Sequence, residues 1–214
     1  ISYPYEWGFD QLRDAAIFTL NFNLELLKDG FTLKDASPYN VQFINSNCVF
    51  IDTLSIVKYN EGDYWIPYRQ FCEGFLNPLI LQSKKNIFYN NFYKGNLTGI
   101  NTSDLSELLS FFNFFSPSIF FHVFLQNYLS RKNVDTDYKK LKRKFTKNSY
   151  IALIQNCKNL ISKLNYEKKT FWTSYQSNKP YSIEADNSKK KIVAEYINKN
   201  KPNKVIDLGS NNGE

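Results

Sequence analysis

Methionine is absent from the 214 residues, and histidine and cysteine are scarce. Because a chain without methionine lacks its initiator residue, we expect this one to be a piece of a longer protein. The single histidine, His122, argues against a histidine-based catalytic triad or a histidine-rich metal site. The three cysteines, Cys48, Cys72 and Cys157, are odd in number and form no CxxC pair. They argue against a disulfide framework or a zinc site and are typical of a reducing cytosol.

Long hydrophobic runs are missing as well. A helix that spans a bilayer needs about 18 or more consecutive apolar residues. The most apolar stretch, Phe111–Leu125, is interrupted by Asn113, Pro117 and His122. We interpret its phenylalanines as helical core rather than as a membrane anchor. The chain also opens without the basic and apolar pattern of a signal peptide. The sequence therefore predicts a soluble, cytoplasmic protein with no membrane span.

The basic charge is concentrated in one short segment. The chain carries a net charge of +7, and residues 131–147 alone hold eight basic and two acidic residues. A nucleic-acid interface needs stacking aromatic residues among the cations, and only Tyr138 and Phe145 qualify here. Lysine outnumbers arginine 23 to 4 over the whole chain, as an AT-rich coding bias produces. We therefore interpret the segment as a solvated helix face and expect no nucleic-acid partner.

Apolar periodicity predicts a mostly helical chain. Hydrophobic residues make up 43% of the sequence, which is enough to bury a core. Residues 10–27 place apolar side chains on one helical face, and Gly30 follows as a stop signal. Further helices are predicted over residues 64–82, with a bend or break at Pro78, from Ser103 to about Leu129, with a break at Pro117, and over residues 150–164 and 188–200.

Three short stretches favour strands. Val41–Ile44 and Val49–Ile51 flank a polar Asn45-Ser46-Asn47 sequence that is typical of a hairpin turn. Lys204–Leu208 is predicted as a buried strand. The fold class is therefore mainly α with a small β-hairpin, ending in the first strand of a Rossmann-like α/β domain.

An acidic residue and a glycine-spaced turn follow the last predicted strand. Asp207, Gly209 and Gly213 form a D-x-G-x-x-x-G pattern, with Ser210 and Asn211 between the glycines. Glycines permit a sharp turn and the close approach of a ligand. The pattern resembles motif I of class I S-adenosylmethionine-dependent methyltransferases, in which this loop wraps the amino-acid part of the cofactor. A single glycine motif is a weak signal, so a tight loop of another α/β fold is the alternative.

A second group of candidate site residues lies on either side of the predicted hairpin. Asp35 and Asn40 are five residues apart, and Asp52 follows the second strand. This order resembles the catalytic loop and metal-binding strand of protein-kinase-like enzymes, and it makes the helical region similar to the C-terminal lobe of a kinase. The resemblance implies that Asp35 acts as the base, while Asn40 and Asp52 hold magnesium against the phosphates of ATP.

Some features depart from the kinase pattern. No His or Arg precedes Asp35, and Asp52 is followed by Thr53-Leu54 instead of Phe-Gly. The glycine-rich loop and the phosphate-pairing lysine of a kinase would lie upstream of Ile1. The alternative is purely structural, with an Asx turn in the loop and an ordinary hairpin carboxylate at Asp52.

Longer stretches resemble one bacterial family. They are Ser2–Trp7, Leu12–Ala16, Leu33–Phe43, Phe50–Ser55 and Tyr68–Cys72, and the similarity runs over almost the whole chain. In these stretches the chain resembles S-adenosylmethionine-dependent methyltransferases related to nodulation host-specificity proteins, which have a long N-terminal region before the methyltransferase domain. The resemblance implies that the full-length protein transfers a methyl group, with the cofactor at the motif that includes Asp207; it does not imply the acceptor.

These patterns lead to one organisation with two alternatives. We expect a helical, kinase-C-lobe-like region over residues 1–165, a linker over 166–187 and the start of a methyltransferase domain over 188–214. The expected cofactor of the full-length protein is S-adenosylmethionine, which this chain alone should not bind tightly. In one alternative the first region is a phosphotransferase lobe that uses ATP and magnesium. In the other it is a binding module, either a non-catalytic module for the methyltransferase or a binder of nucleic acid or an anionic surface through residues 131–147.

Overall fold

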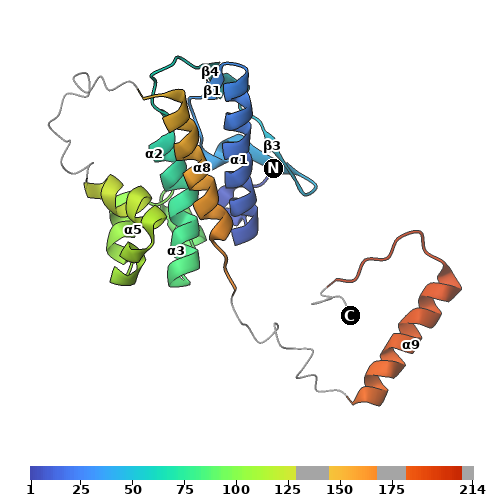
Figure 1. Ribbon diagram of the computed structural model, residues 1–214. Coiled ribbons are helices and arrows are strands. Elements are labelled where there is room, and N and C mark those ends of the chain that lie inside the picture. The colour runs from blue at the N-terminus through green and yellow to red at the C-terminus, as the bar shows by residue number, and fades with distance from the viewer. Residues whose placement is uncertain (129–144, 168–181, 209–214) are drawn as a thin grey trace. The chain divides into compact units, whose positions relative to one another are not determined.

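The computed structural model describes residues 1–128, 145–167 and 182–208. The chain divides into two compact units, Ile1–Tyr166 and Glu167–Glu214. The described residues are mostly helical, with two small antiparallel sheets of two strands each (Figure 1). The prediction of a mainly helical chain with a small hairpin is therefore confirmed.

Short elements connect a few longer helices in the first unit. Its helices are α1 (Phe9–Lys28), α2 (Tyr68–Phe71), α3 (Asn77–Lys85), α4 (Asn90–Gly95), α5 (Thr102–Leu108), α6 (Pro117–Ile119) and α8 (Lys147–Lys163). Its strands are β1 (Phe31–Leu33), β2 (Val41–Ile44), β3 (Asn47–Phe50) and β4 (Ile56–Lys58). Single 3-10 turns cover Pro4–Glu6, Pro38–Asn40, Thr53–Ser55 and Phe111–Phe115, and π-helical segments cover Cys72–Leu76 and Phe120–Leu125.

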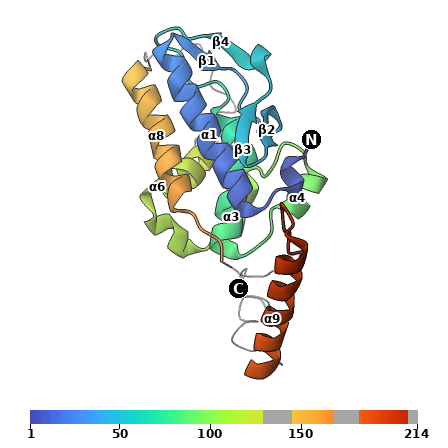
Figure 2. The ribbon, with the colours of Figure 1, turned by 90° about the vertical axis from the view of Figure 1, so that its right-hand side faces the viewer.

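Helix α1 forms the centre of the core of the first unit. Its apolar residues, among them Leu20 and Leu27, are buried on one face, as their spacing predicted. Helix α8 lies beside α1 (Figures 1 and 2) and buries Ile154 and Ile161. The predicted stop is also confirmed, because Gly30 follows the helix with a φ of +80°, a conformation that favours glycine.

One helical run joins α2 to α3 without the break expected at Pro78. The intervening segment Cys72–Leu76 is a π-helix, in which the N–H of Asn77 donates to the carbonyl of Cys72 five residues earlier. Proline has no N–H to donate, and its ring clashes with the preceding turn of a regular α-helix. The wider π turn accommodates both constraints, so the helix continues through Pro78 to its end at Lys85.

The four strands form two antiparallel pairs. Strands β2 and β3 make the predicted hairpin, with Val41 opposite Phe50 and a two-residue turn at Asn45-Ser46. Strands β1 and β4 form a second pair that the sequence did not indicate, with Leu33 opposite Ile56. Strands of three residues are too short to show a periodic pattern, so only tertiary pairing reveals them.

The phenylalanines between 111 and 124 do not form a helical core, which corrects the interpretation drawn from the sequence. Six of them, Phe111, Phe112, Phe114, Phe115, Phe120 and Phe121, are between 41% and 82% exposed. Only intervening positions such as Ile119 and Val123 are buried. A helix buries one face, so adjacent phenylalanines along a run of turns cannot all point inward. No helix in the described part of the chain has the length and apolarity needed to cross a bilayer.

His122 is a hydrogen-bonded core residue. Its Nδ1 lies 2.6 Å from the Tyr68 hydroxyl, and its Nε2 lies 2.9 Å from the Asn156 side-chain oxygen. Since an amide oxygen only accepts, Nε2–H donates to Asn156 and the Tyr68 hydroxyl donates to Nδ1. Burial lowers the pKa of His122, which favours this neutral form. The imidazole thus links α2 and α8 to the helical run that begins at Pro117.

The second unit contains one long helix, α9 (Ile183–Asn200), whose N-terminus is capped by the Ser182 hydroxyl. The helix begins earlier than the predicted residue 188. Its apolar residues Ile192, Val193 and Tyr196 are all exposed, and none of its residues is buried.

The strand predicted over residues 204–208 is not formed. No strand is assigned there, and Val205, Ile206 and Leu208 are exposed. A strand exists only when a neighbouring strand satisfies its backbone groups, and no described residue pairs with this segment. The apolar composition that favoured a strand is therefore not sufficient to make one.

Candidate functional site

Two neighbouring segments, 34–40 and 51–55, carry the first group of predicted site residues. The β1–β4 pair continues into the hydrogen bond from the Lys34 N–H to the Ser55 carbonyl, at 2.8 Å. The β2–β3 pair continues into the bond from the Ile51 N–H to the Asn40 carbonyl, at 2.9 Å. The two segments are thus held side by side at both ends. The chain folds so that Asp35 and Asn40 lie on one of them and Asp52 on the other.

The carboxylate of Asp35 organises its own loop. One of its oxygens accepts from the N–H of Ser37 at 2.9 Å and from the side-chain amide of Asn40 at 3.0 Å. The first bond is the Asx turn considered in the sequence analysis, and the second joins two predicted site residues directly. Both side chains are partly exposed, so a ligand can reach them. Because Asn40 uses its amide nitrogen toward Asp35, its amide oxygen is the group that could bind a metal.

Asp52 is directed into its own turn. One of its oxygens accepts from the N–H of Leu54 at 3.1 Å, and the other accepts from the Ser55 hydroxyl. It thereby caps the 3-10 turn Thr53–Ser55. The described residues include no group of three or more His, Cys, Asp or Glu side chains that could hold a metal ion. Asp52 and Asn40 carry hard oxygen donors of the kind that magnesium prefers, but both Asp52 oxygens accept hydrogen bonds within the turn.

Helix α2 and the π-helical segment pack against the Asp35 loop. The side chain of Gln70 accepts from the N–H of Ala36 at 2.9 Å. Pro38 packs so closely on Gly74 that a Cβ at Gly74 would lie 2.7 Å from the proline ring. The glycine is therefore needed for the loop to approach the helix. The loop conformation is set by these contacts as much as by its own turn residues.

A buried polar cluster fixes the strand that leads into the loop. The Asn23 side-chain oxygen accepts from the N–H of Leu33 at 2.9 Å and from the Thr32 hydroxyl at 3.0 Å. The Asn23 amide donates to the Tyr150 hydroxyl at 3.2 Å, and that hydroxyl also bonds Thr32. Burial raises the pKa of Tyr150 to about 12. Helices α1 and α8 thus hold β1 in place two residues before Asp35.

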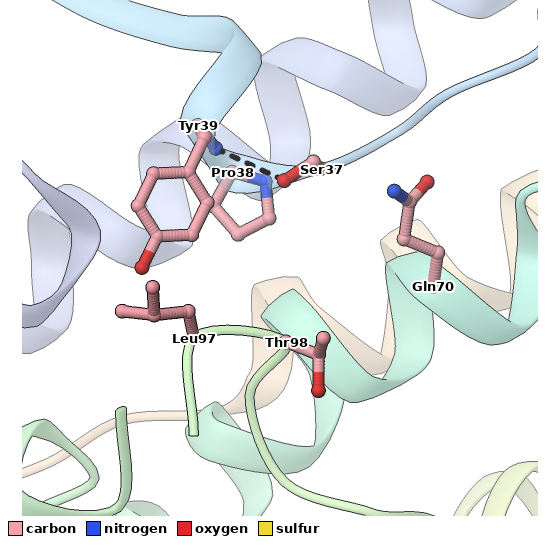
Figure 3. Close-up of a pocket in the computed structure, with 6 residues that line it drawn as sticks. All are labelled: Ser37, Pro38, Tyr39, Gln70, Leu97 and Thr98. Atoms are coloured by element: carbon pink, nitrogen blue, oxygen red, sulfur yellow. Dashed lines mark hydrogen bonds between the residues drawn. The ribbon is translucent and has the colours of Figure 1, made fainter. Parts of the chain in front are cut away.

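A cavity of about 310 Å³ opens beside the same loop. Its lining residues come from the loop, from α2 and from the segment after α4: Ser37, Pro38, Tyr39, Gln70, Leu97 and Thr98 (Figure 3). The hydroxyl of Ser37 accepts from the N–H of Tyr39 on one wall. The Tyr39 hydroxyl is buried and has no hydrogen-bond partner among the described residues. The cavity therefore has mostly apolar walls, and the Tyr39 hydroxyl, which is shielded from solvent, adds no accessible polar group to them.

The second group of predicted site residues is described only at its start. Asp207 is exposed, and its neighbours carry no regular secondary structure. The predicted cofactor-binding residues Gly209, Ser210, Asn211 and Gly213 lie outside the described residues.

Sequence reasoning missed the residues that support the site. Gln70, Tyr150 and Asn23 are polar residues on helices whose sequence pattern shows only an apolar face, so no local signal marks them. Gly74 was detectable in principle, because an isolated glycine within a helical pattern often marks a close approach.

Comparison with known proteins gives one informative relative. Among curated proteins, the chain is similar to the nodulation protein NoeA of Rhizobium meliloti (strain 1021). The two sequences are 39% identical over 221 aligned positions, which cover 100% of this chain and 46% of NoeA. The chain thus spans about half the length of that relative. This similarity supports the nodulation-protein resemblance drawn from the sequence. No family model and no solved structure matches the chain.

Proposed function

We propose that this chain is part of a NoeA-like protein that transfers a methyl group from S-adenosylmethionine to an acceptor. The observation that carries the proposal is the D-x-G-x-x-x-G pattern from Asp207 to Gly213, preceded by a long helix. In this proposal Asp207, Gly209, Ser210, Asn211 and Gly213 hold the cofactor, whose activated methyl group supplies the chemistry. Residues 1–166 form a unit that presents or positions the acceptor.

The exposed apolar face of α9 supports this assignment. Ile192 and Tyr196 are 66% and 69% exposed, although they are spaced to lie on one helical face. A helix of a Rossmann-like domain packs such a face on its sheet. The apolar residues 205–208, also exposed, have the composition of the buried strand that would belong to that sheet.

Cofactor binding by the complete gene product tests the proposal. Calorimetric titration with S-adenosylmethionine should give micromolar binding, and the Asp207→Ala variant should bind much more weakly. Glu195→Ala serves as the matched control, because Glu195 is an exposed acidic residue of α9 in the same unit. No binding by the unmodified protein, or equal loss in both variants, would refute the assignment.

We propose a phosphotransferase lobe as a second candidate function, supported by the arrangement of two segments in the first unit. The two antiparallel strand pairs hold the Asp35 loop against the Asp52 segment, and Asn40 donates to Asp35. This is the order and spacing that a phosphotransferase lobe uses. In that function Asp35 would accept the proton of an acceptor hydroxyl, and Asn40 with Asp52 would bind magnesium on ATP. The adjoining cavity has room for the acceptor.

Nucleotide titration separates this function from a binding module. ATP with magnesium should bind the complete gene product, and Asp52→Ala should abolish binding because it removes a metal ligand. Asp35→Ala should leave binding intact while it removes phosphate transfer, because a base is needed only for the chemical step. Glu61→Ala is the control for the loss of one exposed acidic group. If no protein binds ATP, Asp35, Asn40 and Asp52 are structural residues and the unit is a binding module.

A further inference from the structure

The first unit exposes several phenylalanine side chains that are close together in sequence. We call Phe111, Phe112, Phe114, Phe115, Phe120 and Phe121 the phenylalanine patch. Three of these side chains, Phe111, Phe112 and Phe115, are 72%, 82% and 72% exposed. The patch lies on the turns and the helical run that follow α5, toward the end of the unit away from the β1–β4 pair (Figures 1 and 2).

Contacts between the rings join four of these residues, Phe111, Phe114, Phe115 and Phe120, and Phe112 and Phe121 are their neighbours in sequence. The ring of Phe111 lies 6.0 Å from that of Phe114 and 5.6 Å from that of Phe115. Phe114 in turn lies 5.9 Å from Phe120 and stacks on Phe124 at 3.7 Å. Single exposed apolar side chains are common on proteins, but a cluster of this kind marks a site of interaction.

The sequence around the patch holds no acidic residue and no lysine or arginine. Protein–protein interfaces are also enriched in aromatic residues and depleted of charge at their core, so the charge of the flanking sequence has to distinguish a protein partner from a membrane. No Asp, Glu, Lys or Arg occurs between Leu108 and Ser130. The polar residues that interrupt the phenylalanines, Ser110, Asn113 and Ser116, are small and uncharged. Aromatic side chains on a segment without charged residues can enter an apolar medium without burying a charge from that segment.

The charge of the sequence that follows the patch indicates which apolar medium the phenylalanines enter. Residues 131–147 hold eight basic and two acidic residues, so this segment contributes most of the chain's net charge of +7. Exposed aromatic residues followed by cationic sequence are the combination that binds anionic bilayers, where the rings enter the headgroup region and the cations attract lipid phosphates. A neutral or acidic flanking sequence would have argued for another occupant.

We propose that the phenylalanine patch docks the protein onto an anionic phospholipid membrane. The contact is interfacial, because no described helix is long and apolar enough to span a bilayer. Phe111, Phe112 and Phe115 enter the boundary between headgroups and acyl chains, and the buried face of the same segment, including Ile119 and Val123, anchors them to the core.

Vesicle sedimentation with the 214-residue chain tests this proposal. The protein should bind vesicles made of equal parts phosphatidylcholine and phosphatidylglycerol, and bind pure phosphatidylcholine more weakly. The triple variant Phe111→Ser, Phe112→Ser, Phe115→Ser should bind the anionic vesicles at least about tenfold more weakly. Binding by the unmodified chain should also fall when sodium chloride rises from about 0.1 M to about 0.5 M, because salt screens the lipid charge.

A matched variant controls for the loss of apolar surface in general. Ile44, Leu54 and Ile66 are 62%, 82% and 75% exposed in the same unit but lie outside the patch. Replacing these three with serine should leave vesicle binding unchanged. The proposal is overturned if the unmodified chain binds neither vesicle or if the two triple variants lose binding equally. A third result would also overturn it: the unmodified chain is a dimer, the phenylalanine triple variant is a monomer, and neither of these two proteins binds vesicles. The patch would then be an interface between copies.

Discussion

The two units of the chain contain similar apolar periodicity but differ in how much of it is covered. In the first unit, Leu20 of α1 and Ile154 of α8 are fully buried, because the two helices pack on each other. In the second unit, Ile192 of α9 has the same kind of spacing and is 66% exposed. The comparison teaches that periodicity identifies a helix and its apolar face, whereas burial depends on a partner surface elsewhere in the fold.

The largest difference between the units should appear when one apolar side chain is shortened in each. Leu20→Ala leaves a cavity in the core and should lower the free energy of unfolding by about 2–5 kcal/mol. Ile192→Ala removes an exposed side chain and should change it by less than about 0.5 kcal/mol. Urea denaturation followed by circular dichroism measures both. Equal effects would show that α9 is packed in solution.

The close packing beneath the Asp35 loop should make Gly74 intolerant of a side chain. A Cβ there would lie 2.7 Å from Pro38, so Gly74→Ala should cost about 1–3 kcal/mol of stability. Gly95 is the control, because a Cβ at that position meets no atom within 4 Å. Thermal unfolding of the two alanine variants gives the comparison, and a Gly74→Ala variant as stable as Gly95→Ala would contradict the observed contact.

A smaller effect is expected when the buried polar cluster loses one hydroxyl. Tyr150→Phe leaves the Asn23 amide nitrogen without a partner and removes one of the two hydrogen bonds of the Thr32 hydroxyl, which should cost about 1–2 kcal/mol. Tyr196→Phe, at a residue that is 69% exposed, should have no measurable effect. Urea denaturation at pH 8 measures both differences.

The contribution of the Tyr150 hydroxyl to stability should depend on pH in the alkaline range. Burial raises the pKa of Tyr150 from the ordinary value of 10.0 to about 12. The neutral phenol is therefore favoured in the folded state, and its contribution is complete below pH 10 and is lost as the pH rises toward 12. The stability difference between the unmodified protein and Tyr150→Phe should narrow over that range. A constant difference would mean that the hydroxyl is not buried.

The smallest expected effect concerns His122. Burial lowers the pKa of this imidazole from the ordinary 6.5, so the unfolded chain takes up a proton more readily than the folded one. Stability linked to His122 is thus present above pH 6.5 and lost as the pH falls below it. Urea denaturation between pH 7.5 and pH 5 should show this loss, and His122→Gln should reduce it. An identical acid dependence in that variant would assign the effect to carboxylates instead.

Much of the local structure was predictable from particular residues. The buried face of α1, its stop at Gly30, the β2–β3 hairpin and the core position of His122 each have a local signal in sequence. The β1–β4 pair could not be predicted, because its strands are three residues long and their partners are distant in sequence. The phenylalanine patch was misread, because sequence hydrophobicity does not reveal whether a surface is covered.

The candidate site was also predictable only in part. The positions of Asp35, Asn40 and Asp52 around a hairpin were predicted, and the structure brings Asp35 and Asn40 into a direct hydrogen bond. The supporting contacts of Gln70 and Gly74 depend on how α2 and the π-helical segment pack under the loop. Those contacts arise between distant segments and leave little trace in local sequence.

One titration tests most directly the claim that methyl transfer depends on a cofactor site begun in the second unit. S-adenosylmethionine is titrated by calorimetry into the complete gene product and, in parallel, into the 214-residue chain. The account predicts micromolar binding by the complete product and no tight binding by the chain alone. Absence of binding by the complete product would contradict the methyltransferase assignment, and tight binding by the chain alone would place the cofactor site elsewhere.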